Sequence, residues 1–169
     1  MIKAKISGVD RVVRSFDRKR TDIEQALSEG TEEAGDYLIE CIEDKFGVYQ
    51  PGWEKLKHET IMRKKRRGAG ANATKPLVEF GDMMFSFFKK TSAKTRKHVV
   101  HIFSNDPKII HHIYGAPNAN VPKRDPVRPT IKEENDKCLE IIKDAVRRIL
   151  WLKIWEQLSI ILLRPWLNY

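Results

Sequence analysis

The 169-residue sequence has little cysteine and no long uninterrupted apolar run. Its two cysteines, Cys41 and Cys138, lie far apart, and each falls within an apolar helical pattern, which favours two buried thiols over a disulfide. The opening residues, MIKAKISGVDRVV, contain no apolar core of the length of a signal peptide. No segment reaches the roughly 18 consecutive apolar residues of a membrane-spanning helix. We therefore expect a soluble protein made in the cytosol.

The sequence also lacks the residue patterns of catalysis and of cofactor binding. Residues 68–75, GAGANATK, resemble a phosphate-binding loop, but in that motif the lysine is followed by Ser or Thr, whereas Lys75 precedes Pro76. The five histidines include no pair on one face of an expected element, and no cysteine pair accompanies them. There is no nucleophile elbow and no pair of carboxylates on a rigid frame. We expect a protein that is not an enzyme and that needs no metal or other cofactor.

Charge is abundant and unevenly distributed. Lys and Arg outnumber Asp and Glu by 32 to 23, a net charge of +9, which indicates an anionic partner such as nucleic acid or an acidic protein surface. Between Asp22 and Asp44 there are nine carboxylates and no Lys or Arg. This acidic flank is either a solvated helix face or a surface that meets the basic segment of another copy in a head-to-tail ring. In the second interpretation, the interface between subunits contains Glu32, Glu33, Asp36 and Glu40.

Hydrophobic periodicity predicts an α+β fold in which two long helices pack on a small β-sheet. Apolar residues recur at three- and four-residue intervals over residues 9–46, which predicts one long helix or two abutting ones ended at Gly47. Within this segment, Gly30 and Gly35 predict a kink or a close helix contact.

Shorter elements and two long loops connect these helices. Residues 68–76 lack apolar periodicity and residues 116–129 are rich in proline, so we expect mobile loops there. Thr60 is the expected cap of a short basic helix. A further short helix is expected to bury Met84, Phe85, Phe87 and Phe88. The remaining predictions are strands over residues 2–8 and 98–104, and helices over residues 61–67, 83–90, 107–114 and 130–163.

We expect a single domain over residues 1–150, followed by an apolar helical extension over residues 151–169. The stretch ILWLKIWEQLSIILL has eleven apolar residues among fifteen, spread around most of a helix. A helix that is apolar all round must be covered by something, which favours self-association or a partner surface over a helix lying in a membrane interface. The predicted contact residues are Trp151, Trp155, Leu158, Ile161 and Leu162.

Several short motifs follow one another through the middle of the chain. Each is short and degenerate, so the information lies in their order. They are GWEKL (52–56), Thr60, Lys64, PL (76–77), FGDMM (80–84), Ser86, HIYG (112–115) and PVRPT (126–130).

In this order the motifs resemble the virion-morphogenesis, or tail-completion, family of tailed bacteriophages and prophages, and the related minor tail proteins at the head–tail joint. The resemblance covers roughly residues 50–150. Phe80 stands where the family commonly has Thr, and Thr130 where it usually has an aromatic residue.

The resemblance implies a structural virion protein without enzymatic activity, which completes the tail and joins it to the DNA-filled head. Such proteins form rings, commonly hexamers, in the virion neck or tail, and they assemble in the cytoplasm of the host bacterium. The implied partners are other copies of the chain, neck or connector proteins, and tail terminator or tail tube proteins, with packaged DNA as a non-specific contact. The two long loops would be docking arms, with the contact residues Arg63, Lys64, Lys65, Arg66, Arg67, Lys123, Arg124 and Arg128.

An alternative interpretation makes the chain a basic accessory protein that contacts DNA non-specifically through residues 62–75. Helical spacing spreads the five consecutive basic side chains of residues 63–67 around the helix, so sequence-specific reading is not expected. In the structural interpretation, the same segment is ordered by protein neighbours, and the expected contact is the acidic flank of an adjacent copy.

Overall fold

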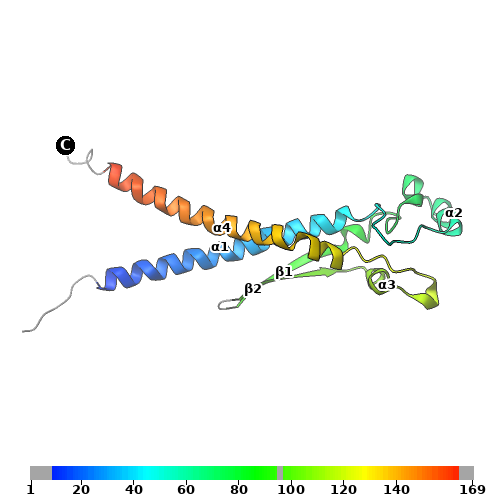
Figure 1. Ribbon diagram of the computed structural model, residues 1–169, viewed down its shortest axis with the longest axis horizontal. Coiled ribbons are helices and arrows are strands. Elements are labelled where there is room, and N and C mark those ends of the chain that lie inside the picture. Colours follow the sequence, from blue (N-terminus) through cyan, green and yellow to red (C-terminus); the bar gives the residue numbers. More distant parts are fainter. Residues whose placement is uncertain (1–8, 95–96, 164–169) are drawn as a thin grey trace, which may run out of the picture.

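Two helices of 36 residues each dominate the fold and lie side by side in antiparallel directions (Figure 1). The computed structural model describes residues 9–94 and 97–163. The predicted α+β class is confirmed, because the helices accompany a two-stranded antiparallel sheet. In chain order the elements are α1 (Val9–Asp44), α2 (His58–Arg66), the 3-10 helices η1 (Gly70–Thr74) and η2 (Met84–Ser86), β1 (Phe87–Lys94), β2 (Lys97–Ser104), α3 (Lys108–Tyr114), the 3-10 helix η3 (Pro117–Ala119) and α4 (Arg128–Leu163).

Helices α1 and α4 pack closely because small residues face each other where the helices meet. A Cβ atom added to Gly30 would lie 2.7 Å from the Cβ of Ala145 and 3.0 Å from the Cα of Ile142. Ala26 and Ala34, about one turn to either side of Gly30, are buried as well. Gly30 therefore marks a close helix contact, which is one of the two predicted alternatives. Beyond this contact, the first turns of α1 and the last turns of α4 diverge (Figure 1).

The sheet is a β-hairpin that packs on another side of α1. Strands β1 and β2 pair antiparallel, with Phe87 opposite Ser104. Val100 of β2 lies against Gly35, where an added Cβ would be 2.8 Å from the Val100 Cγ1. Gly30 and Gly35 are five residues apart and so lie about 140° apart around the helix. The hairpin and α4 consequently contact different sides of α1.

A small hydrophobic core joins the C-terminal end of α1 to the hairpin and to α3. Its buried members are Ile42, Phe46, Val78 and Ile109. The Phe46 ring meets the Phe87 ring of β1 edge to face, with the centroids 5.9 Å apart. These residues come from separate parts of the chain, so the core fixes the end of the molecule at which the connecting segments gather (Figure 1).

Most of the predicted elements are confirmed, but the prediction of a helix over residues 83–90 is wrong. The strand over residues 98–104 is most of β2, and the helices over residues 107–114 and 130–163 correspond to α3 and α4. Phe87 instead begins β1, because pairing with β2 supplies the backbone hydrogen bonds that a helix would otherwise make. Phe85, which that helix would bury, is 69% exposed. The strand expected over residues 2–8 lies outside the described residues.

Both segments that were predicted to be long mobile loops contain local structure and buried residues. In the first, residues 70–74 form η1, and Ala73 is 1% exposed. In the second, Ala116 pairs with Val121 as an isolated β-bridge, and the buried Asp125 carboxylate accepts hydrogen bonds from the backbone N–H groups that follow it. Composition alone indicated disorder in these segments, whereas the structure has local turns and buried polar contacts there.

The expected extension after residue 150 continues α4 without a break to Leu163. Trp151 and Leu152 are the last side chains described on this helix, and they are 61% and 64% exposed. No described helix combines the length and the apolar composition needed to cross a membrane. Four of the predicted contact side chains lie outside the described part of the chain, namely Trp155, Leu158, Ile161 and Leu162.

Replacing Gly30 with Ala should destabilise the protein, although alanine has the higher helix propensity. The added Cβ has no room beside Ala145, and overpacking of this kind costs about 1–3 kcal/mol. Thermal unfolding followed by circular dichroism measures the change. Combining Gly30→Ala with Ala145→Gly should cost less than the sum of the single changes, since the second removes the nearest atom. Strictly additive losses, or a stabilised Gly30→Ala protein, would contradict the close contact.

Candidate functional site

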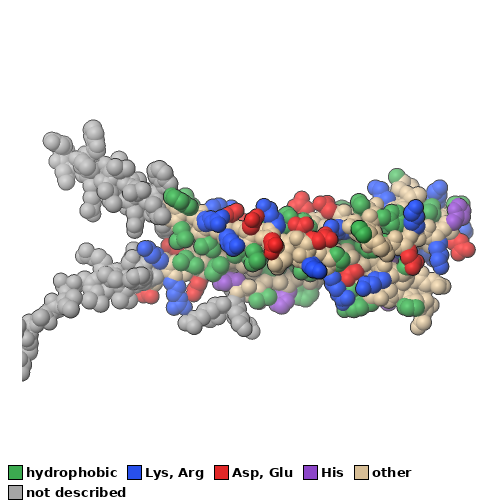
Figure 2. Space-filling view, viewed as in Figure 1, with side chains coloured by type: hydrophobic (Ala, Val, Ile, Leu, Met, Phe, Trp, Pro, Cys, Tyr) green, Lys and Arg blue, Asp and Glu red, His purple; other side chains and the backbone are tan. Residues whose placement is uncertain are grey.

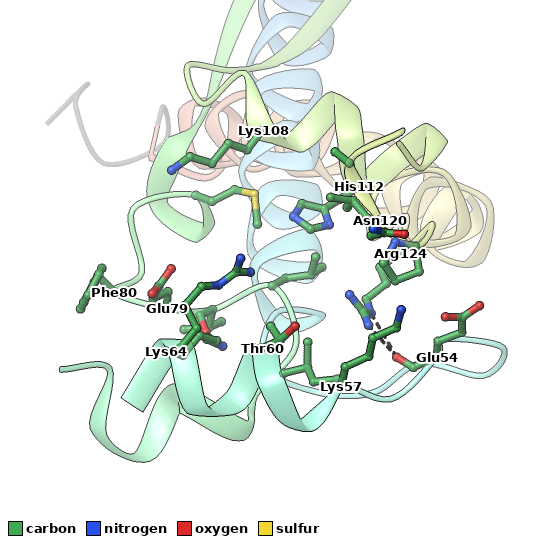
Figure 3. A pocket seen from close by; sticks show the side chains of 18 of the residues that line it. Glu54, Lys57, Thr60, Lys64, Glu79, Phe80, Lys108, His112, Asn120 and Arg124 are labelled. Atoms are coloured by element: carbon green, nitrogen blue, oxygen red, sulfur yellow. Dashed lines mark hydrogen bonds between the residues drawn. The ribbon is translucent and has the colours of Figure 1, made fainter. Parts of the chain in front are cut away.

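The described residues enclose a cleft of about 250 Å³ at the end of the molecule where the connecting segments gather (Figure 3). It lies between α2, residues 77–83, α3 and residues 119–124. Figure 3 shows His112 reaching into it from α3, with Lys57 on the opposite wall. Lys64 and Arg124, two of the predicted docking residues, also line this cleft.

Lys64 is a structural residue, and its prediction as a docking contact is wrong. It is 7% exposed, and its Nζ donates hydrogen bonds to the backbone carbonyls of Asn72, Lys75 and Val78. Burial lowers the pKa of this ammonium, Glu79 nearby acts in the opposite direction, and Arg124 lowers it further. The lysine therefore closes the segment over residues 70–78 onto α2.

Helix α2 starts two residues before Thr60, so the prediction that Thr60 caps it is wrong. The helix begins at His58 with Lys57 at the cap position, and no side chain caps it there. The early start adds a turn that carries Glu59 near the N-terminus, where a carboxylate is favoured by the helix dipole.

Arg124 is also structural, which makes its prediction as a docking residue wrong. It is 5% exposed, and its Nε and Nη2 donate to the carbonyl oxygen of Glu54 at 3.2 and 2.8 Å. Its backbone N–H donates to the carbonyl of His112 at 2.8 Å. Burial lowers the pKa of the guanidinium. Arg124 thus ties the tryptophan-containing segment before α2 to the end of α3 across the cleft.

Two buried polar atoms of the cleft make no hydrogen bond within the described residues, and these are His112 Nδ1 and Glu79 Oε1. Burial, aided by Arg124 and His111, lowers the pKa of His112 to about 4, so the imidazole is neutral at pH 7. Glu79 Oε1 lies 3.6 Å from Arg67 Nη1, an ion pair that is too long for a hydrogen bond.

His112 and Glu79 are cleft residues that the sequence did not predict. A signal for His112 was present, because it lies three residues after the buried Ile109 and therefore on the same face of α3. No comparable signal exists for Glu79, which lies between regular elements.

The remaining predicted basic contacts do not form one surface. Arg63, Lys65 and Arg66 are exposed on α2, and Arg63 borders the cleft. Lys123 is exposed beyond α3. Arg128 instead places its guanidinium 4.5 Å from the centre of the Tyr114 ring and 3.7 Å from an oxygen of the Asp125 carboxylate.

Part of the acidic flank of α1 is matched by cations of the same chain. Lys89 Nζ of β1 forms ion pairs with Asp36 and Glu32, and Arg148 of α4 binds Glu33 with both oxygens 2.7 Å from its Nη2. Glu40 is exposed. Three of the four carboxylates proposed for a subunit interface therefore have partners within the fold.

The described residues include no group of three or more His, Cys, Asp or Glu side chains placed to hold a metal ion. Cys41 and Cys138 are both free thiols, as predicted, and they are only half-buried. Burial raises the pKa of each, which leaves them protonated and unreactive near neutral pH.

A scan of the chain against protein-family models finds no match, and comparisons with curated proteins and with solved structures find none either.

Lys64→Met should destabilise the protein by about 2–3 kcal/mol, because the ammonium leaves while the carbonyls that it binds stay buried. Thermal unfolding measures the loss, and amide hydrogen exchange should accelerate over residues 70–78. The matched control is Lys65→Met, which changes an exposed neighbour and should cost less than about 0.5 kcal/mol. Equal effects of the two substitutions would argue against a structural Lys64.

Stability should fall by about 1–2 kcal/mol between pH 7 and pH 5 because of His112. The folded-state pKa of about 4 lies below the ordinary 6.5, so the unfolded chain binds more protons in between and is favoured as the pH falls through that window. Urea unfolding at the two pH values measures the difference. His112→Gln should flatten the dependence, whereas His111→Gln, a change at an exposed neighbour, should keep it. The same slope in both variants would assign it to other groups.

Proposed function

We propose that this chain is a structural virion protein of a tailed bacteriophage or prophage, which completes the tail and joins it to the head as a subunit of a neck ring. The observation that carries the proposal is the position of the motif residues. The motifs that suggested the tail-completion family are spread over residues 52–130, yet many of their residues line one cleft or pack against one small core at the same end of the molecule.

The motif residues support the fold through specific contacts. Ser86 Oγ donates to the carbonyl of Met83 at 2.7 Å and lies 2.6 Å from Ser104 Oγ, which joins η2 to the end of β2. Thr130, 0% exposed, donates its hydroxyl to the carbonyl of Pro126 at 2.7 Å and so fixes the first turn of α4. Side chains employed in this way maintain a shape, which is the role expected of a structural virion protein.

The surface of the chain supports assembly. Among the described residues, exposed large apolar side chains outnumber the buried ones, which is unfavourable for a free monomer when the exposed groups are contiguous. A ring of identical subunits, with six as the expected number, would cover such groups in an interface. Those on α4 are Ile131, Leu139, Leu150, Trp151 and Leu152.

The alternative, DNA binding through residues 62–75, has weaker support. Of the six basic residues in that segment, Lys64 is buried and Arg67 pairs with Glu79. The exposed remainder that could reach phosphates consists of Arg63, Lys65 and Arg66 on α2 and Lys75 beyond it. Three exposed cations on a short helix and one beyond it supply little of the phosphate contact that non-specific binding needs.

The purified protein should form oligomers that a polar change on α4 weakens. Light scattering coupled to size-exclusion chromatography measures the mass, and Trp151→Glu should shift it toward the monomer, whereas Glu140→Gln on the same helix should not. Virions of the phage that encodes the chain should contain it in few copies, as measured by mass spectrometry of purified particles. A protein that is monomeric at every concentration and is missing from virions would overturn the proposal.

A further inference from the structure

The β-hairpin has one face toward α1 and one face turned away from it. Alternation along the strands sends Phe87, Lys89 and Val100 toward α1, where they contact Phe46, Asp36 and Gly35 respectively. The opposite, outward face carries Phe88, Lys90, Val99, His101 and Phe103.

Two aromatic rings stack on this outward face. Phe88 and Phe103 occupy directly opposite positions of the two strands, with ring centroids 5.4 Å apart and planes 22° from parallel. Phe103 remains 43% exposed although Phe88 covers part of it. The His101 ring lies 6.0 Å from Phe103, and in Figure 2 histidine and hydrophobic side chains gather over the hairpin. The face therefore offers exposed aromatic surface held in place by cross-strand pairing.

A cation sits on the same aromatic pair. The Lys90 Nζ lies 6.0 Å from the Phe88 centroid and 5.8 Å from the Phe103 centroid. Within the described residues, Lys90 has no carboxylate partner, whereas Lys89 on the inward face has two. An ammonium beside exposed rings matches the chemistry of a nucleotide, which presents an anionic phosphate next to a flat base.

The basic composition of the hairpin also favours an anionic ligand. From Met83 to Asn105 the sequence contains five Lys or Arg residues, two His and no Asp or Glu. Of these cations, Lys89 forms ion pairs with Glu32 and Asp36 of α1. Lysine on a sheet edge also discourages pairing with another strand, but that role does not require a lysine placed over two rings on the sheet face.

We infer that the outward face of the β-hairpin binds single-stranded nucleic acid, with Phe103 stacking on a base and Lys90 contacting the adjacent phosphate. A single strand is favoured over a duplex because its bases are free to leave their own stack and lie on a side-chain ring. Contact between the hairpins of two copies is disfavoured on this face, because two such hairpins would repel each other. The inference is independent of the neck-ring proposal and shifts nucleic-acid contact from residues 62–75 to residues 87–104.

The test is fluorescence anisotropy of the full chain with a labelled 20-nucleotide oligo-dT and with the duplex of the same length. The single strand should bind at least tenfold more tightly. Phe103→Leu, which keeps an apolar side chain but removes the ring, should weaken binding by about tenfold or more. Lys90→Gln should reduce the slope of log affinity against log salt by about 0.7.

Lys65→Gln is the matched control, because it removes an exposed lysine from α2 and should change the affinity less than twofold. Unfolding curves and oligomer mass should be unchanged in Phe103→Leu, which separates a loss of binding from a loss of fold or of assembly. Equal affinity for duplex and single strand, unchanged binding by Phe103→Leu, or an equal loss with Lys65→Gln would each overturn the inference. So would the absence of any binding to oligo-dT.

Discussion

Two glycines of α1 set the architecture, because each lets a different element approach the helix backbone. At Gly30 the neighbours are Ala145 and Ile142 of α4, and at Gly35 the neighbour is Val100 of β2. Both contacts are closer than a Cβ would allow, so neither position tolerates a larger residue without a shift. With α4 and the hairpin held on separate sides of α1, only a small core is needed to fix the remaining segments.

The same packing brings acidic and basic residues that are far apart in the sequence next to each other. The acidic residues of α1 face cations delivered from distant parts of the chain, namely Lys89 to Asp36 and Arg148 to Glu33. Exposed pairs of this kind contribute at most about 1 kcal/mol each, so they adjust how the elements sit more than they hold them together. Their main consequence is electrostatic, because they match part of the acidic flank within the chain. Lys90 on the outward face of the hairpin and the exposed cations of α2 have no carboxylate partner among the described residues.

The long elements of this fold are readable from the sequence because periodicity over many residues is a local signal, as for α1, α4 and most of β2. Strand β1 was not readable, since residues 87–94 become a strand only through pairing with β2. The roles of Lys64 and Arg124 were hidden for a similar reason. In a sequence, Lys64 cannot be told from Lys65, and its burial depends on carbonyls 8 to 14 residues away that fold back onto it.

These buried cations change how the net charge of the chain should be interpreted. The densest basic run is not the most accessible one, since folding removes Lys64 to the interior and pairs Arg67 with Glu79. The hairpin has fewer cations per residue, but its sequence holds no acid to neutralise them. Because the hairpin and α4 lie on different sides of α1 (Figure 1), contact with a polyanion and burial of the apolar α4 surface would not compete. The proposed assembly through α4 and the inferred binding of nucleic acid by the hairpin are therefore separable in this fold, and each can be removed without the other.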